Sequence, residues 1–226
     1  MCGRFALDQT TDALIAEFVA STNRFPLWAP RWNIAPTSTI PIVVTNDDGE
    51  RIVGPARWSL VPPWSTELTL KYPTFNARSE TAAEKPTFRG SVNKSRCIVP
   101  ISGYYEWTSM GGTKEPHFVY RPGQAVVGLA GLYSWWTNPA SGERIATATI
   151  LTREGAGVLA EVHDRMPIAL EPDDQDRWLS RDHSDGASII SDVSETAARN
   201  ANSWDHYEVA PLRGDGPELR ERKDEQ

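Results

Sequence analysis

Residues 96–107, RCIVPISGYYEW, decide the fold of this chain. They hold two runs of β-branched and aromatic residues on either side of Ser102 and Gly103, a composition typical of two consecutive strands. We expect these strands at residues 96–100 and 103–108. The same composition, interrupted by Gly, Pro or Asn, predicts further strands at residues 116–121, 125–135 and 144–152. The middle of the chain is therefore expected to form a mainly antiparallel sheet.

Shorter strand signals lie on both sides of this region. Residues 46–49, Asn-Asp-Asp-Gly, form a hairpin turn signal between predicted strands at 40–45 and 51–60. Residues 26–37 are rich in proline and tryptophan and are expected to form an ordered loop. A last strand is expected at residues 206–212.

Four segments predict short helices. They are residues 9–20, 79–84, 172–180 and 184–202. Thr10 or Thr11 can cap the first helix, whose apolar stripe includes Phe18 and Val19. Ser79 can cap the second, and the third begins with proline and acidic residues, as helix N-termini do.

These elements predict the α+β fold class: a single domain over residues 1–212, with a mainly antiparallel, barrel-like β-sheet flanked by short helices. Residues 213–226 are strongly charged, and we expect them to form a disordered tail. The 226 residues are enough to bury one proper core.

Composition excludes several classes of protein. No run approaches 18 apolar residues, and the N-terminus lacks the layout of a signal peptide, so neither a membrane span nor secretion is expected. The two cysteines, Cys2 and Cys97, do not suggest a disulfide framework. We expect a cytoplasmic protein that acts as a monomer, with no cofactor. The histidines and cysteines show no metal-ligand spacing, so no metal is expected.

Charge is distributed unevenly along the chain. The net charge is −7, which alone argues against a nucleic-acid partner. Residues 171–226 carry 15 acidic and 7 basic side chains, whereas residues 71–96 carry six basic and two acidic ones. A local basic face on an acidic protein is enough to contact phosphates, although the same pattern also suits an ordinary solvated surface.

The most distinctive chemical feature is Cys2. Cysteine is small enough for Met1 normally to be trimmed, and trimming leaves Cys2 with a free α-amine and a thiol on one residue. The α-amine has a pKa of about 7.7–8.0, far below that of lysine, so much more of it is a free nucleophile near neutral pH. An aldehyde can form an imine with this amine and close a thiazolidine ring through sulfur. Taken alone, an ordinary second residue remains the simpler interpretation.

Two other residues suit proton transfer. Glu106 lies within a predicted strand of bulky aromatic residues, where it either faces solvent or occupies an apolar pocket. In a pocket, loss of solvent would suit a carboxyl group to proton transfer near neutral pH. His163 is followed by Asp164 and Arg165, which can orient a histidine and bind an anion, although a structural histidine fits the pattern equally well.

Anion-binding and stacking residues are the remaining candidates. Residues 76–80 lie at a predicted strand-to-helix turn, where backbone N–H groups and Arg78 can hold an anion, and Arg4 can do the same near Cys2. Residues 32–36 and 61–64 place tryptophan and proline in loops, either as wedges against nucleic-acid bases or as caps on the core.

Several short motifs in one order resemble the SOS response-associated peptidase family of abasic-site processing proteins. The matching stretches are MCGRFAL at 1–7, WNIAPT at 32–37, RWSLVPPW at 57–64, FNARSET at 75–81, RCIVPISGYYEW at 96–107, KEPHFVY at 114–120, AGLYSWW at 130–136, ILTREG at 150–155, VHDRMPIAL at 162–170 and GDGPEL at 214–219. They run over almost the whole chain. The resemblance implies an α+β domain with a barrel-like sheet and, as partner, single-stranded DNA that contains abasic sites.

The resemblance also implies roles for individual residues. Cys2 would form the covalent crosslink to the abasic site, Glu106 would act as general acid and base, His163 would assist opening of the sugar ring, and Asn76 would orient the Cys2 backbone or the sugar. The DNA-binding residues would be Arg4, Asn33, Pro36, Trp64, Arg78, Trp107, Thr152 and Arg165. Lyase-type chemistry and self-removal of Met1 would follow, although a housekeeping aminopeptidase would also suffice.

Three other functions remain open at this level. An N-terminal-nucleophile hydrolase such as a glutamine amidotransferase also begins Cys-Gly, but its downstream amide-binding motifs are not found here. A non-covalent single-strand binding module fits the tryptophans and the basic segment. A protease acting on other proteins would need a catalytic triad or a zinc motif that the sequence does not suggest.

Overall fold

The computed structural model describes residues 2–18, 20, 22–23, 28–110, 113–181 and 185–223. Two sheets share the chain. The smaller has the strand order β13-β9-β8-β1-β3, and all its pairings are antiparallel. Its strands are β1 (Arg4–Leu7), β3 (Arg31–Ile34), β8 (Gly103–Met110), β9 (Thr113–Tyr120) and β13 (Asp205–Glu208).

The larger sheet closes into a barrel. Its order is β12-β11-β10-β7-β4-β5-β2, and a parallel pairing between β5 and β11 joins the two ends of the central five strands. Its strands are β2 (Thr22–Asn23), β4 (Thr39–Thr45), β5 (Arg51–Trp58), β7 (Arg96–Ile101), β10 (Val127–Thr137), β11 (Arg144–Glu154) and β12 (Arg165–Pro167), and β6 (Asn76–Arg78) pairs with β11. The expected antiparallel, barrel-like α+β domain is confirmed.

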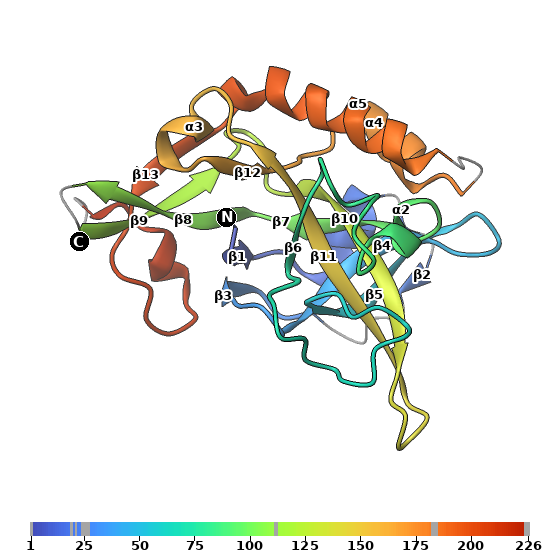
Figure 1. Ribbon diagram of the computed structural model, residues 1–226. Coiled ribbons are helices and arrows are strands. Elements are labelled where there is room, and N and C mark those ends of the chain that lie inside the picture. Colours follow the sequence, from blue (N-terminus) through green and yellow to red (C-terminus); the bar gives the residue numbers. More distant parts are fainter. Residues whose placement is uncertain are drawn as a thin grey trace.

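Short helices flank the sheets. Figure 1 shows α4 and α5 side by side along one side of the molecule, while the end of the β10–β11 hairpin projects away from them. The helices are α1 (Thr11–Glu17), α2 (Arg89–Val92), α3 (Leu159–Val162), α4 (Pro172–Leu179) and α5 (Gly186–Arg199), with 3₁₀ turns η1 (Ala201–Ser203) and η2 (Pro217–Arg220). As expected, the Thr10 side chain caps α1 by accepting from the Ala13 N–H. Val19 lies outside the described residues.

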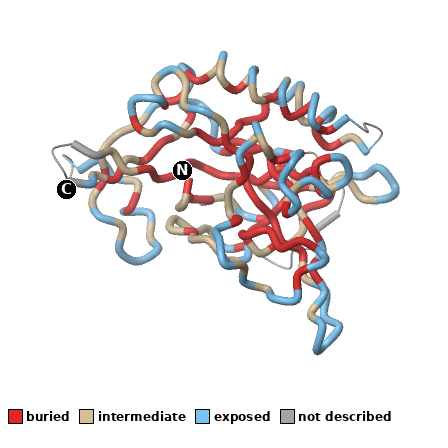
Figure 2. Tube along the Cα trace, in the orientation of Figure 1, coloured by how far each residue is buried: buried red, intermediate tan, exposed pale blue. Residues whose placement is uncertain are grey.

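The main core fills the barrel and the space under α4 and α5. In Figure 2 the buried residues run continuously along the central strands, whereas the exposed residues lie at the periphery. Trp58 and Trp178 are among the largest fully buried side chains. A second, smaller cluster covers the other face of the smaller sheet and contains Ala6, Tyr105, Phe118, Val209 and Leu219.

Three sequence-based expectations need correction. The segment 26–37, which was expected to be a loop, contains the strand β3, because residues 31–34 pair with β1. The predicted helix at 79–84 is absent from the described residues there, because the Ser79 N–H donates to the Thr152 carbonyl at 2.8 Å and so extends the pairing of β6 with β11. Residues 213–223 are not a disordered tail. Leu219 is buried in the second cluster, and Arg220 stacks on Phe118 at 5.0 Å.

Candidate active site

Cys2 lies just before β1, the strand between β8 and β3 in the smaller sheet. Its side chain is fully buried. The Asn76 Nδ2 atom donates to the Cys2 carbonyl at 2.8 Å. Asn76 opens β6 and is in register with Ile150 of β11, so the barrel wall fixes the side chain that holds the Cys2 backbone. The predicted contact between Asn76 and the Cys2 backbone is present.

Burial and a nearby acidic charge both act on the Cys2 thiol. Burial raises the pKa of this thiol, and the negative charge of Glu106 raises it further. The pKa of the Tyr104 phenol is also raised, first by burial and then by Cys2 and Glu106. Burial therefore favours the protonated form of the Cys2 thiol, and Glu106 is the acidic residue whose charge acts on both Cys2 and Tyr104.

Glu106 occupies a pocket rather than facing solvent. Only 5% of this residue is exposed, and its Oε1 atom accepts from the Trp107 N–H at 3.3 Å. Together with Trp107, Lys114, Val162 and His163 it lines a hollow of about 480 Å³. The two residues expected to transfer protons, which are far apart in sequence, thus line one cavity.

His163 directly follows α3 as its C-cap residue. Its Nδ1 atom accepts from the Arg165 N–H at 2.9 Å and lies 2.6 Å from Asp164 Oδ1. When Nδ1 accepts, the neutral ring carries its proton on Nε2; when Nδ1 is protonated, it can donate to Asp164. Both protonation states therefore have a partner, which suits a group that takes up and releases a proton.

Arg165 is held by an acidic residue that the sequence did not single out. Its two terminal nitrogens bind both carboxylate oxygens of Glu80, at 2.7 and 2.9 Å. One of these nitrogens also donates to the Thr152 carbonyl at 2.8 Å. The hydrogen bonds from Arg165 lower the pKa of Glu80 to about 2, so the carboxylate stays ionised near neutral pH.

The other expected DNA-binding residues differ in what their side chains contact. Arg4 and Asn33 are joined, because Arg4 NH1 donates to Asn33 Oδ1 at 2.9 Å. Arg78 is exposed at the end of β6, in register with Thr152. Thr152 itself is fully buried, and its hydroxyl donates to the Ala77 carbonyl at 3.4 Å. The expectation that Thr152 contacts a phosphate is therefore not supported, because the barrel wall covers its side chain.

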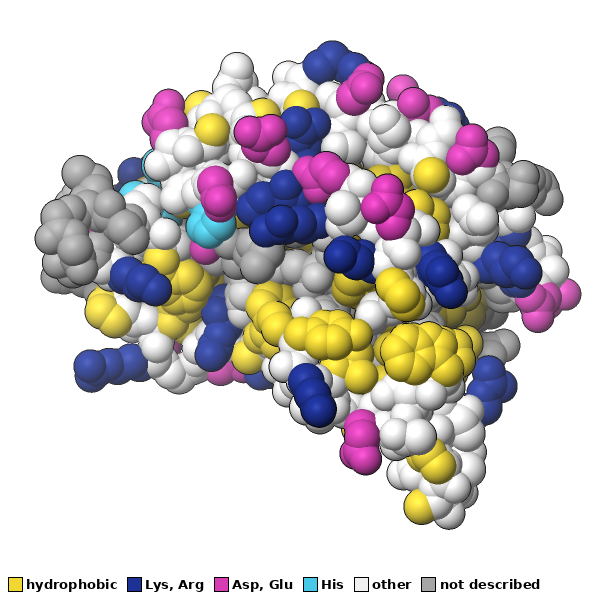
Figure 3. Space-filling model, in the orientation of Figure 1, with side chains coloured by type: hydrophobic (Ala, Val, Ile, Leu, Met, Phe, Trp, Pro, Cys, Tyr) yellow, Lys and Arg dark blue, Asp and Glu magenta, His cyan; other side chains and the backbone are white. Residues whose placement is uncertain are grey.

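The expected stacking residues differ in exposure. Trp64 is 63% exposed, whereas Trp107 and Pro36 are half-buried. Pro36 precedes Thr37, whose positive φ of 73° marks a sharp change of chain direction. In Figure 3 apolar side chains form a band across the face in view, with both basic and acidic side chains on either side of it.

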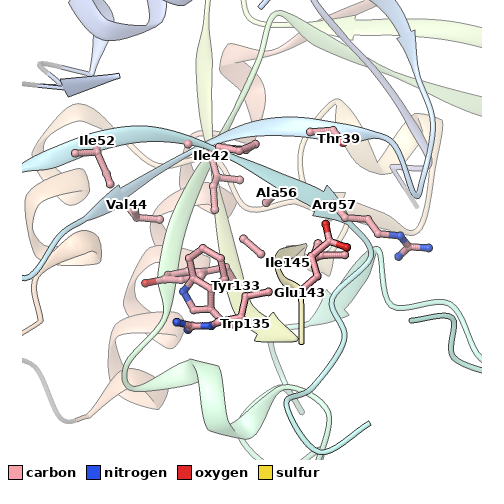
Figure 4. Close-up of a pocket in the computed structure, with 14 residues that line it drawn as sticks. Thr39, Ile42, Val44, Ile52, Ala56, Arg57, Tyr133, Trp135, Glu143 and Ile145 are labelled. Carbon is pink, nitrogen blue, oxygen red and sulfur yellow. The ribbon is translucent and has the colours of Figure 1, made fainter. Parts of the chain in front are cut away.

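A second hollow has a different character. Figure 4 shows side chains of β4 and β5 facing those of β10 and β11 across a space of about 430 Å³. Its lining is mainly apolar and includes Ile42, Ile52, Tyr133 and Trp135. None of the candidate catalytic or DNA-binding residues is among the described residues that line it.

Further features of the described residues concern metals and membranes. No cluster of three or more His, Cys, Asp or Glu side chains suited to a metal ion is found among them. His117 and His206 do approach each other, with their Nδ1 atoms 3.1 Å apart. Within the same described ranges, every helix is too short or too polar to cross a membrane.

Comparisons with known proteins identify the family of the chain. The family model described as SOS response associated peptidase (SRAP) matches residues 1–212. The abasic site processing protein YoqW of Bacillus subtilis (strain 168) is 32% identical over 98% of this chain and 99% of its own length. YoaM of the same organism, with the same description, is 37% identical over 80% of this chain and 79% of its own.

More distant relatives extend the match. The abasic site processing protein HMCES of Xenopus tropicalis is 30% identical over 79% of this chain and 66% of its own length. A crystal structure of a protein from Bacteroides thetaiotaomicron covers 98% of this chain and 99% of its own, with a TM-score of 0.83 and 23% identity. That likeness concerns the fold.

Proposed function

Because the chain belongs to the SOS response-associated peptidase family, we propose that it recognises abasic sites in single-stranded DNA and links to them covalently through Cys2. Relatives that match nearly the full chain carry the description abasic site processing protein. The observation that supports the proposal most is the hydrogen bond from Asn76 to the Cys2 carbonyl. Glu106, whose charge acts on the Cys2 thiol, lines a cavity together with His163.

The reaction needs the α-amine of Cys2. Removal of Met1, by the protein itself or by an aminopeptidase, frees this amine. The amine attacks the open-chain aldehyde of the abasic sugar, and loss of one water molecule gives an imine. The thiol sulfur then adds to the imine carbon while its proton passes to the nitrogen, which closes the thiazolidine ring. The sum is aldehyde plus aminothiol giving thiazolidine plus water.

The neighbouring residues supply the proton transfers. Glu106 accepts and returns protons during imine formation and ring closure, because it is the carboxylate that interacts with the thiol. His163 assists opening of the sugar ring, which converts the cyclic form into the reactive aldehyde. The hydrogen bond from Asn76 to the Cys2 carbonyl keeps the nucleophile in place while the substrate binds.

DNA binding uses the groups around this cavity. Arg4, Arg78 and Arg165 contact phosphates on either side of the lesion, and Asn33 acts together with Arg4. Trp64, Trp107 and Pro36 contact bases and bend the strand at the abasic site.

Intact-mass measurement tests the proposal. The protein is weighed alone and after mixing with an oligonucleotide that carries one abasic site. We expect loss of one methionine and then an adduct of protein plus oligonucleotide minus water that survives denaturation without borohydride. Cys2→Ala should keep the amine and form only an imine, which is trapped by borohydride and otherwise lost. A stable adduct from Cys2→Ala would rule out the thiazolidine.

A further inference from the structure

The segment after β13 reaches back to the opposite edge of the smaller sheet. Val209 forms an isolated bridge with Arg222, and Leu219 in η2 is buried in the second cluster. Between them, Asp215 contacts β3. Its Oδ1 atom accepts the backbone N–H groups of Trp32 and Asn33, at 2.6 and 2.8 Å. A carboxylate that accepts two adjacent backbone N–H groups fixes the path of that strand.

The same segment fixes the Asn33 side chain. Asn33 Nδ2 donates to the Gly214 carbonyl at 2.8 Å. An amide side chain has one oxygen and one NH₂ group, so this bond turns Oδ1 the other way. Oδ1 is the atom that accepts from Arg4 NH1 at 2.9 Å. Gly214 and Asp215 thus determine which amide atom faces the guanidinium group two residues after Cys2.

We propose that Asp215 is a positioning residue for DNA binding, which acts through Asn33 to hold Arg4 beside Cys2. The inference rests on the proposed function and assigns a role to Asp215, which lies in the GDGPEL stretch at 214–219 and beyond residue 212, where the family model ends. Asp215 also pairs with Arg31 Nε at 2.8 Å, which offsets the repulsion that its negative charge would exert on a nearby phosphate.

Comparison of two charge-matched variants tests the proposal. Asp215→Ala and Asp192→Ala each remove one negative charge, and Asp192 on α5 pairs with Arg177 in a surface ion pair. Loss of negative charge alone should strengthen binding to an intact single-stranded oligonucleotide, or leave it unchanged, in both. We expect Asp215→Ala instead to weaken binding about tenfold. Without Asp215, Arg4 is no longer held in place to make its charge-assisted hydrogen bond to phosphate.

The double variant separates positioning from a general structural effect. If Asp215 acts through Arg4, Asp215→Ala should have no further effect on affinity in an Arg4→Ala background. The slope of log K against log[salt] should become shallower by about 0.7 in Asp215→Ala and in Arg4→Ala. This is the value for one lost phosphate contact on single-stranded DNA. Additive losses of affinity in the double variant would overturn the proposal.

Two further readouts keep the result unambiguous. Asp215→Asn keeps an oxygen that can accept the Trp32 and Asn33 N–H groups, so it should retain most of the affinity even where Asp215→Ala folds poorly. Crosslinking of the unaltered protein to an abasic oligonucleotide is measured in parallel. If it fails, the proposed function falls. If it succeeds while Asp215→Ala binds like Asp192→Ala, only the positioning role falls.

Discussion

Arg165 shows, at the scale of single residues, how internal pairing competes with ligand binding. Both of its terminal nitrogens are engaged by Glu80, and its side chain is only 13% exposed. Because the pKa of Glu80 is about 2, the carboxylate stays charged over the range in which DNA is bound. A phosphate that approaches Arg165 therefore has to displace the ionised Glu80 carboxylate, which also repels it. Both effects oppose binding.

Glu80→Gln should for this reason tighten binding to single-stranded DNA. The amide keeps the shape of the side chain but removes the charge that competes with phosphate, and we expect a gain in affinity of about threefold to tenfold for a half-exposed pair. Fluorescence anisotropy with a labelled oligonucleotide measures it. Asp192→Asn, on α5, removes one charge from another exposed ion pair and serves as the control. Equal affinities of the two variants would contradict the competition.

The sequence predicted these residues unevenly. The contact between Asn76 and the Cys2 backbone was expected from the resemblance and is present. Glu80 and Asp215 were missed, because their partners lie 85 and 182 residues away in the chain and local pattern carries no information on such pairs. For Thr152 the opposite holds: its motif position suggested DNA binding, and the sequence did not reveal that the barrel buries its side chain completely.

At the scale of elements, β8 connects the core to the cavity. It begins at Gly103 and carries Glu106 three residues later, so its alignment with β9 sets where the carboxylate lies. A Cβ atom at Gly103 would lie 2.3 Å from the Phe118 ring and 2.7 Å from the Val119 carbonyl. The close approach of β9 therefore requires glycine at this position.

Gly103→Ala should destabilise the protein, because the neighbouring backbone has to move. We expect a loss of about 1–3 kcal/mol in the free energy of unfolding, as for other overpacked core positions. Gly54→Ala on β5 is the matched control, since a Cβ there meets nothing within 4 Å. Urea unfolding compares the two variants. A Gly103→Ala protein as stable as Gly54→Ala would show that β9 does not pack as closely as described.

Element length explains which parts of the fold were predictable. The strands β4, β5, β7, β10 and β11 have long β-branched or aromatic runs, and each was expected close to its observed bounds. Short elements such as β1, β6 and α3 were not expected. They have three or four residues each and form because neighbouring strands supply their hydrogen bonds or packing, which the local sequence does not reveal.

At the scale of the whole molecule, an acidic protein has to bind a polyanion. The chain carries a net charge of −7, and its acidic excess lies in residues 171–226, which include α4 and α5. Arg4, Arg78 and Arg165 instead belong to strands of the two sheets, β1, β6 and β12. Salt screens the distant acidic charges within about 10 Å at 0.1 M, so the arginines close to a phosphate decide binding.

The salt dependence of binding should therefore report on few contacts. Three phosphate contacts predict a slope of log K against log[salt] of about −2 for single-stranded DNA. Arg78→Ala should make this slope shallower by about 0.7, because Arg78 is exposed at the end of β6 and faces solvent. Arg199→Ala removes the same charge from α5 and should leave the slope unchanged. Titrations at four or more salt concentrations give both slopes, and a common decrease in the two variants would mean that overall charge, rather than a local arginine cluster, attracts the DNA.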